Sequence, residues 1–246
     1  MRSMSLPESS RVRRAYGSHP DQYVDVWAAS GSARKGLAVV VHGGYWRAAF
    51  TAATTLALAA DLFARDWDVA NIEYRRVGAG GGYPTILEDA SAAIALAVRE
   101  HGGAAARVVL VGHSVGGELA LLNASQADAV LGLAPVTDVV RTFREGLGDN
   151  AAAEFIAAGP DQAPQAYEAA SPRWRLPVGR PVLITYGVDD ARVPVQHSRD
   201  YRAAASARGD QVELREYSRL PHGDQIDPSA PHWPGAAEWL AAVRVG

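Results

Sequence analysis

Short apolar runs of strand length alternate along this chain with longer segments that have helical periodicity. The strand-like runs are Leu37–Val41, Asp68–Tyr74, Arg107–Val111, Ala129–Leu133, Val182–Tyr186 and Val212–Tyr217. The helical segments between and after them are 54–66, 84–101, 115–126, 194–208 and 234–243. Because such alternation is typical of βαβ units, we predict an α/β fold with a mainly parallel, doubly wound sheet and helices on both faces.

The first part of the chain predicts strands of two kinds. Tyr23–Ala28 alternates apolar and polar residues, which indicates a half-buried strand at the edge of the sheet. Leu37–Val41 is a continuous run rich in valine, which indicates a strand buried on both faces. Residues 1–15 are polar and contain four arginines, and we predict that they form a flexible leader.

Residues 137–175 break the alternation between strands and helices. This stretch contains alanine-rich helical pieces interrupted by Gly159-Pro160, Pro164 and Pro172. A connection in a compact α/β domain usually needs only a few residues outside its helix. We therefore predict a single domain over 1–246 with a small helical cap inserted at about 137–175.

Composition excludes several classes of function. The 246 residues contain no cysteine, which rules out a thiol nucleophile, a disulfide scaffold and a thiolate-bound metal. A net charge of −3 gives no basic surface for nucleic acid. No apolar stretch approaches the ~20 residues needed to cross a bilayer, and the N-terminal residues lack the apolar run of a secretory signal. We expect a cytoplasmic protein without nucleic-acid or membrane partners; the sequence does not set its oligomeric state.

One motif has the residues of a nucleophile elbow. Gly112-His113-Ser114-Val115-Gly116 follows a strand-like run directly and precedes a helical segment. A sharp strand-to-helix turn strains the serine backbone and exposes its hydroxyl, and the flanking glycines let neighbouring segments approach. The start of the helix then faces developing negative charge. We predict Ser114 as the nucleophile; the alternative is a glycine-rich turn with a capping serine.

A second motif, His42–Trp46 (HGGYW), follows the first fully buried run. Its paired glycines leave backbone N–H groups unshielded, so an N–H of Gly44 or Tyr45 can join that of Val115 in an oxyanion hole. We expect the histidine that opens the loop to fix it by hydrogen bonding rather than to act as a base. Tyr45 and Trp46 are candidates either for core packing or for a wall of the substrate pocket.

Two adjacent carboxylates, Asp189 and Asp190, follow the run Val182–Tyr186. A carboxylate at a strand end can orient an imidazole and stabilise its protonated form. The D-x-x-V-P spacing puts Asp190 on the turn before the next helical segment. We therefore predict Asp190 as the acid and assign Asp189 a turn or capping role.

The base is expected after the last strand. His222, in the sequence LPHGD, lies between Val212–Tyr217 and the final helical segment. The order Ser114, Asp190, His222 is the chain order of a triad on a doubly wound sheet. His232 is the main alternative base, since it also lies close to the closing helix.

These motifs resemble the α/β-hydrolase superfamily and, within it, small esterases and arylformamidase-like (kynurenine formamidase-like) hydrolases with an HGGxW oxyanion loop. The resemblance runs from about residue 16 to 240 and includes Glu73-Tyr74-Arg75, Tyr83-Pro84, Asp89 and Ala170-Ser171-Pro172. The elbow reads GHSVGG where formamidases often have GHSAGA, and residues 76–82 lack the A-P-E of related esterases. The resemblance implies Ser–His–Asp acyl transfer without a metal or organic cofactor.

The sequence thus predicts a serine hydrolase that cleaves small-molecule carboxylic esters or aryl formamides. One alternative is an arylformamidase acting on N-formylkynurenine, and another is an inactive binding protein with a hydrolase fold. The candidates for the substrate pocket are aromatic residues of the cap and residues beside the motifs: Phe143, Phe155, Tyr167, Trp174, Tyr45, Trp46 and His113.

Overall fold

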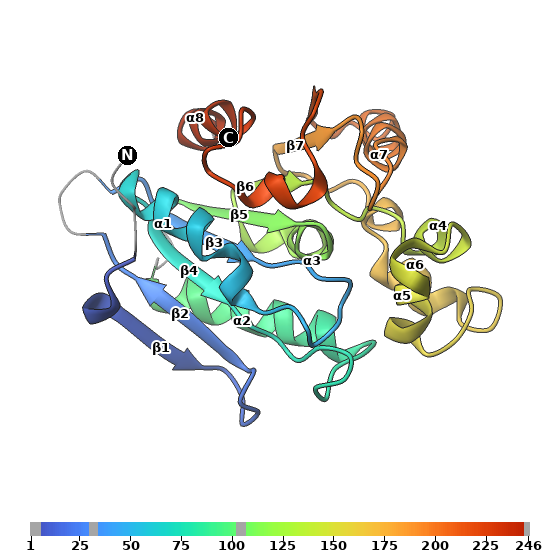
Figure 1. Cartoon of the computed structure of the whole chain (residues 1–246), viewed down its shortest axis with the longest axis horizontal. Coiled ribbons are helices and arrows are strands. Elements are labelled where there is room, and N and C mark those ends of the chain that lie inside the picture. Colours follow the sequence, from blue (N-terminus) through green and yellow to red (C-terminus); the bar gives the residue numbers. More distant parts are fainter. Residues whose placement is uncertain (1–5, 30–33, 102–106, 244–246) are drawn as a thin grey trace.

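Eight strands form one sheet in the computed structural model, which describes residues 6–29, 34–101 and 107–243. The strands are β1 (Arg11–Ala15), β2 (Tyr23–Trp27), β3 (Leu37–Val41), β4 (Asp68–Ile72), β5 (Val108–His113), β6 (Ala129–Leu133), β7 (Val182–Gly187) and β8 (Val212–Tyr217). Their spatial order is β1-β2-β4-β3-β5-β6-β7-β8. The pairs β1–β2 and β2–β4 are antiparallel, and all other neighbours are parallel (Figure 1).

Helices cover both faces of this sheet, as predicted. They are α1 (Leu56–Ala64), α2 (Thr85–His101), α3 (Val115–Leu122), α4 (Val139–Arg144), α5 (Leu147–Ile156), α6 (Pro164–Ala170), α7 (Gln196–Ser206) and α8 (Trp233–Ala242). Buried residues of α1 and α8 form one apolar cluster with the sheet, while those of α2, α3, α7 and the α4–α6 segment belong to the cluster on the other face. Within the described residues, no helix is both long and apolar enough to cross a membrane.

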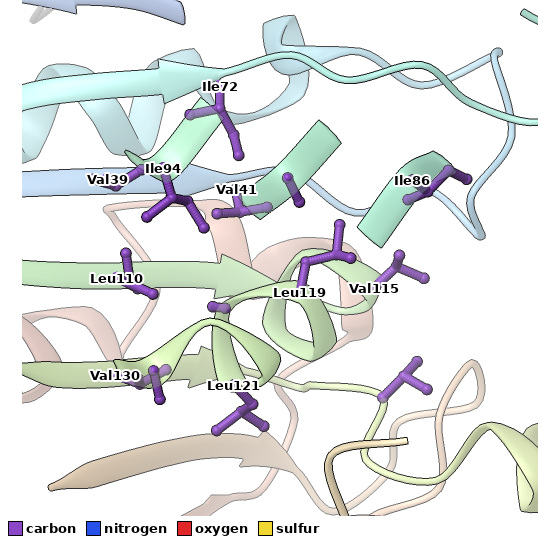
Figure 2. Packing of buried hydrophobic residues seen from close by; sticks show 14 of the residues in the cluster. Val39, Val41, Ile72, Ile86, Ile94, Leu110, Val115, Leu119, Leu121 and Val130 are labelled. Carbon is purple, nitrogen blue, oxygen red and sulfur yellow. The ribbon is translucent and has the colours of Figure 1, made fainter. Parts of the chain in front are cut away.

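The central strand β3 explains why its sequence is apolar throughout. Leu37, Val39 and Val41 pack into the cluster with α2 and α3, whereas Ala38 and Val40 pack into the cluster with α1 and α8. Figure 2 shows Val39 and Val41 among side chains from neighbouring strands and helices. Because successive side chains of a strand point to opposite faces, a strand covered on both sides has no position that faces solvent, which favours apolar residues throughout.

The N-terminal segment differs from its prediction. Arg11–Ala15 is not part of a flexible leader but forms β1, paired in antiparallel register with β2. The prediction of β2 as an edge strand is therefore wrong, because β1 takes the edge. All five residues of β1 are exposed, so backbone pairing and the Arg13–Asp25 ion pair hold this strand rather than apolar burial. Residues 1–5 of the predicted leader lie outside the described residues.

The segment predicted as a cap contains α4, α5 and α6, followed by a short 3₁₀ turn at Pro172–Arg175. These helices lie together beside the sheet, at the right of Figure 1. Phe155 and Tyr167 are fully buried within the same core cluster as α2 and α3. The segment is thus packed onto the rest of the fold through an apolar interface.

Candidate active site

The loops that carry the sequence motifs meet at one edge of the sheet. The parallel strands β3, β5, β7 and β8 all end at this edge, since Val41 pairs with Gly112 and Gly187 pairs with Tyr217. The loops that follow these strands hold the HGGYW motif, the elbow, the paired aspartates and the LPHGD segment. Open α/β sheets bind ligands at the carboxyl ends of their strands.

The elbow serine has the backbone conformation expected of a nucleophile elbow. Ser114 has φ 55° and ψ −120°, a region that residues with a side chain rarely adopt, and α3 begins at the next residue. The carbonyl of Ser114 accepts hydrogen bonds from the backbone N–H groups of Gly117, Glu118 and Val136. The turn is therefore held by its neighbours despite its local cost of about 1–3 kcal/mol.

The glycines around Ser114 are required by close contacts. A Cβ at Gly112 would lie 2.1 Å from the carbonyl oxygen of Gly116, and a Cβ at Gly116 would lie 2.1 Å from that of Val41. A Cβ at Gly43 would lie 2.9 Å from the Cβ of Ser114. These residues let the elbow and the HGGYW loop pack against each other.

Asp190 and His222 form a direct pair. His222 Nδ1 donates to Asp190 Oδ2 at 2.7 Å, and Asp190 Oδ1 accepts from the backbone N–H groups of Arg192 (2.8 Å) and Val193 (3.1 Å). Burial alone would raise the pKa of Asp190, but the bonds from His222 and the two N–H groups lower it below its usual value. The carboxylate is thus ionised and fixed, as an orienting group for an imidazole must be.

The loop of His222 is held close to β7 by two further features. A Cβ at Gly187 would lie only 1.8 Å from the carbonyl oxygen of Leu220, so this approach requires glycine. The His222 carbonyl accepts a hydrogen bond from His113 Nε2 at 3.0 Å, and the two rings lie 4.6 Å apart. Burial, together with the nearby His222, lowers the pKa of His113 to about 3, so His113 is a neutral donor.

A cavity of about 280 Å³ joins the motifs. It is lined by Gly43, Gly44, Tyr45, Phe50, Thr54, His113, Ser114, Arg192, His222, Gly223 and Ile226. Ser114 and His222 thus line the same cavity. Within the described part of the chain, the Ser114 hydroxyl makes no hydrogen bond to the His222 ring. Asp190 lies behind His222, outside the lining of the cavity.

The HGGYW loop carries a run of residues with left-handed backbone geometry. The φ values of Gly44, Tyr45 and Trp46 are 120°, 53° and 59°. The backbone N–H groups of Gly44, Tyr45 and Val115 donate to no backbone carbonyl within the described chain. Gly44 and Tyr45 line the cavity, and Val115 begins α3 directly after the elbow serine. The N–H groups of Gly44 and Tyr45 thus border the cavity without a backbone partner among the described residues, and that of Val115 lies next to the elbow serine; unpaired N–H groups are what an oxyanion hole requires.

His42 anchors this loop from inside the protein. Its ring is fully buried, with Nδ1 at 2.7 Å from the Gly43 carbonyl oxygen and Nε2 at 2.8 Å from Glu73 Oε1. Glu73 also accepts from the backbone N–H of Ala52 and from Arg76. Burial is the main cause that lowers the pKa of His42 to about 3. His42 is thus a structural residue of the loop and lies away from the cavity.

A buried carboxyl lies beneath the elbow, one helical turn after Ser114. Glu118 is fully buried, and neither carboxyl oxygen has a hydrogen-bond partner among the described residues. Burial raises the pKa of Glu118 well above its usual value, which favours the uncharged carboxyl. The uncharged form would place no negative charge behind the oxyanion loop. Sequence reasoning missed this residue, because a glutamate inside a helix normally indicates a solvated face.

The predicted pocket wall is only partly correct. Tyr45 and His113 line the cavity, but Trp46 is 1% exposed and stacks on Phe155 in the core, with ring centroids 4.7 Å apart. Trp174 is 54% exposed and lies at a separate surface depression. The prediction of Trp46 and Trp174 as pocket residues is therefore wrong.

The other cap aromatics are also absent from the cavity lining. Phe155 and Tyr167 are buried in the core, and Phe143 packs edge-on against Tyr167. The cap instead approaches the site at Gly148, where a Cβ would lie 2.4 Å from the Tyr45 ring. Sequence reasoning missed four lining residues: Phe50, Thr54, Arg192 and Ile226. Of these, only Arg192 belongs to a motif that had been singled out, D-x-x-V-P.

The alternative acid and base lie elsewhere. His232 is fully buried, and its Nε2 lies 3.0 Å from the Gln225 carbonyl oxygen, so it holds the turn before α8. Asp189 is exposed to solvent and does not line the cavity. The geometry favours Asp190 and His222 over both alternatives.

Comparison with known proteins finds esterases. The family model BD-FAE matches residues 24–130, which include the HGGYW loop and the elbow. An isoprenylcysteine alpha-carbonyl methylesterase of Arabidopsis thaliana is 26% identical over 248 aligned positions, which cover 88% of this chain. The match spans 57% of that relative's length.

Solved structures of esterases share the fold at low sequence identity. A truncated carbohydrate esterase from gut microbiota has a TM-score of 0.81 at 17% identity, covering 96% of this chain and 98% of the other. A propionate-bound thermophilic esterase of Thermogutta terrifontis has a TM-score of 0.74 at 21% identity, covering 95% of each chain. These likenesses, with the parallel sheet order, confirm the predicted α/β-hydrolase fold.

Proposed function

We propose that this α/β-hydrolase-fold protein is a serine esterase that cleaves carboxylic esters of small molecules. One observation carries the proposal. The strained Ser114 elbow and the His222 ring line the same cavity, and Nδ1 of that ring is hydrogen-bonded to Asp190. A nucleophile, a base and an orienting carboxylate in this relation are the parts that acyl transfer needs.

The proposed reaction begins with attack of Ser114 Oγ on the ester carbonyl carbon. Because Nδ1 of His222 donates its proton to Asp190, Nε2 carries the lone pair that takes the Ser114 proton. A Ser114–His222 hydrogen bond is expected to form when substrate fills the cavity, because catalytic hydrogen bonds often tighten only in the complex. His222 then protonates the leaving alcohol, and water cleaves the acyl-enzyme by the same route.

The negative oxygen of the tetrahedral intermediate would bind to the N–H of Val115 and that of Gly44 or Tyr45. Each such donor contributes about 2.7–4 kcal/mol to the transition state. The His42–Glu73 pair supports this role by fixing the loop from inside. The raised pKa of Glu118 is consistent with it, because a buried anion there would oppose the developing charge.

The comparisons support ester hydrolysis as the activity. BD-FAE, the methylesterase and the structural neighbours named above are similar to this chain over its nucleophile elbow or its whole fold. In a further structure, esterase 2 of Thermogutta terrifontis is phosphonylated by sarin, and it has a TM-score of 0.73 to this chain at 20% identity. A cavity of about 280 Å³ suits short or medium substrates.

An ester and amide panel tests the proposal. Wild-type protein should hydrolyse p-nitrophenyl acetate faster than p-nitrophenyl octanoate, and Ser114→Ala should lose this activity while keeping its circular dichroism spectrum and melting temperature. N-formylkynurenine is the discriminating substrate, since an arylformamidase would prefer it by orders of magnitude. Wild-type-like hydrolysis by Ser114→Ala would refute the proposal, and failure of folded wild type on every substrate would favour an inactive binding protein.

A further inference from the structure

We propose that Arg192 makes this esterase selective for substrates that carry a carboxylate in addition to the ester bond. The inference rests on the proposed function, because it names the substrate class of the same cavity. Arg192 lies in the loop between β7 and α7, and it lines the cavity together with Ser114 and His222.

The backbone of Arg192 is fixed at both ends of the residue. Its N–H donates to Asp190 Oδ1 at 2.8 Å, and its carbonyl accepts from the Tyr45 hydroxyl at 3.0 Å. One residue thus connects the loop of the acid to the oxyanion loop. The side chain that leaves this fixed backbone is exposed, so it can reach a ligand without breaking either contact.

Arg192 lines the cavity, and no carboxylate among the described residues neutralises its guanidinium. Arg192 forms no ion pair within the described part of the chain, and both oxygens of Asp190 are already bonded to His222, Arg192 N–H and Val193 N–H. The positive charge acts on Tyr45: burial raises the pKa of that hydroxyl, and the Arg192 guanidinium opposes the rise. The charge therefore lies beside a residue that lines the cavity.

Arginines near the site that serve structure are paired, which sets Arg192 apart from them. Arg47 bonds to Glu154 across the oxyanion loop and α5, and Arg141 bonds to Glu145 within the cap. Apart from Arg192, the described residues of the lining include no arginine, lysine or carboxylate; the lining residues not yet assigned a part in the reaction are Phe50, Thr54, Gly223 and Ile226.

A carboxylate is the group that this arrangement recognises best. A guanidinium offers a planar fork of N–H donors that matches a carboxylate, and such charge-assisted bonds are stronger than neutral ones. At an exposed position the expected gain is about two- to fivefold in affinity, and added salt should reduce it. The uncharged part of the substrate would contact the apolar side chains of Phe50 and Ile226.

Two matched pairs of substrates test the proposal on each side of the ester bond. In the first pair, 4-acetoxybenzoate and 4-acetoxybenzamide, the leaving groups differ by one negative charge. In the second pair, methyl hydrogen glutarate and methyl 4-carbamoylbutanoate, the acyl groups differ by one negative charge. Wild type should prefer the carboxylate member of at least one pair by about two- to fivefold in kcat/KM, mainly through KM, at low ionic strength. In 0.5 M NaCl the preference should shrink.

Variants separate charge recognition from general damage to the site. Arg192→Gln should reduce the ratio of kcat/KM between the carboxylate and the amide substrate to near one. Arg192→Lys should keep part of the wild-type preference. Arg99→Gln, which removes an exposed charge on α2 away from the cavity, should keep the wild-type ratio.

Three outcomes would overturn the inference. These are equal kcat/KM of wild type for both members of each pair, an equal loss on both members in Arg192→Gln, and no cleavage of either pair by a protein that cleaves p-nitrophenyl acetate. Folded wild type that does not cleave p-nitrophenyl acetate would instead contradict the proposed esterase activity. The two proposals therefore fail in distinguishable ways.

Discussion

Two histidine–carboxylate pairs lie at the carboxyl edge of the sheet, and they are nearly identical in length. His42 Nε2 lies 2.8 Å from Glu73 Oε1, and His222 Nδ1 lies 2.7 Å from Asp190 Oδ2. Both histidines follow parallel strands, at loops that flank the same cavity. Short distance between an imidazole and a carboxylate therefore does not by itself identify a catalytic pair.

The surroundings of the two rings differ. The ring of His42 is fully buried, stacks on Tyr74, and has an oxygen partner at each nitrogen. The side chain of His222 is 13% exposed and borders the cavity, with only one nitrogen taken by Asp190. A histidine can transfer protons to and from a substrate only if one nitrogen is free and reachable. This difference favours a structural role for His42 and the role of catalytic base for His222.

The largest expected effect comes from removing the exposed ring. His222→Gln should lower kcat for p-nitrophenyl acetate by about 10⁴-fold or more, because Ser114 loses its base. The melting temperature should change little, since the ring is partly exposed and lies outside the core clusters. Steady-state kinetics and thermal unfolding of the same preparation measure both. Activity within tenfold of wild type would contradict the role of His222.

The converse change, in the buried pair, should affect stability. Glu73→Met leaves His42, Arg76 and the Ala52 N–H without their shared partner, and should cost about 3–5 kcal/mol of unfolding free energy. Urea unfolding measures this loss. The folded fraction should still react with a fluorophosphonate, because His222 and Asp190 are untouched. Unchanged stability combined with abolished labelling would reverse the assignment of the two pairs.

Lowering the pH should destabilise the protein through the buried ring of His113. Burial lowers the pKa of His113 to about 3, whereas in the unfolded chain a histidine titrates near ~6.5. The unfolded state therefore binds this proton first as the pH falls. Below ~6.5 the contribution of this ring should decrease the unfolding free energy with a slope that approaches about 1.4 kcal/mol per pH unit. Urea unfolding at pH 7, 6 and 5 measures the slope, and equal stability at the three values would exclude it.

The smallest effect is expected at the aromatic residue that lies far from both pairs. Trp174→Ala should leave kcat/KM for short esters unchanged within twofold, because the side chain is exposed at a different surface depression. As a comparison, Phe50→Ala removes a ring that lines the cavity and should raise KM. A raised KM in Trp174→Ala would contradict this prediction and indicate that Trp174 of the cap contacts the substrate.

Much of the fold and the relative placement of the motifs could be predicted from sequence, for a physical reason. A strand covered on both faces, such as β3, has no position that faces solvent and is therefore mainly apolar, and the turns that follow parallel strands must lie at one edge. Strand β1 could not be predicted in this way. Its sequence, RVRRA, buries no residue, and backbone hydrogen bonds to β2 hold it in place.

The cavity wall was less predictable than the motifs. Trp46 and Tyr45 are adjacent and similar in chemistry, yet one ring enters the core and the other borders the cavity. Their directions depend on the left-handed backbone of the loop, which glycine positions suggest but do not define. Phe50 and Ile226 reach the cavity from segments without motifs, so only tertiary packing reveals them.

Covalent labelling of the intact protein with a fluorophosphonate tests most directly whether His222 and Asp190 activate Ser114. Mass spectrometry of folded wild type should find one adduct, on the peptide that contains Ser114, and none in Ser114→Ala. The adduct should form far more slowly in His222→Gln. A folded wild type that remains unlabelled, or a Ser114→Ala variant that is labelled like wild type, would contradict the account.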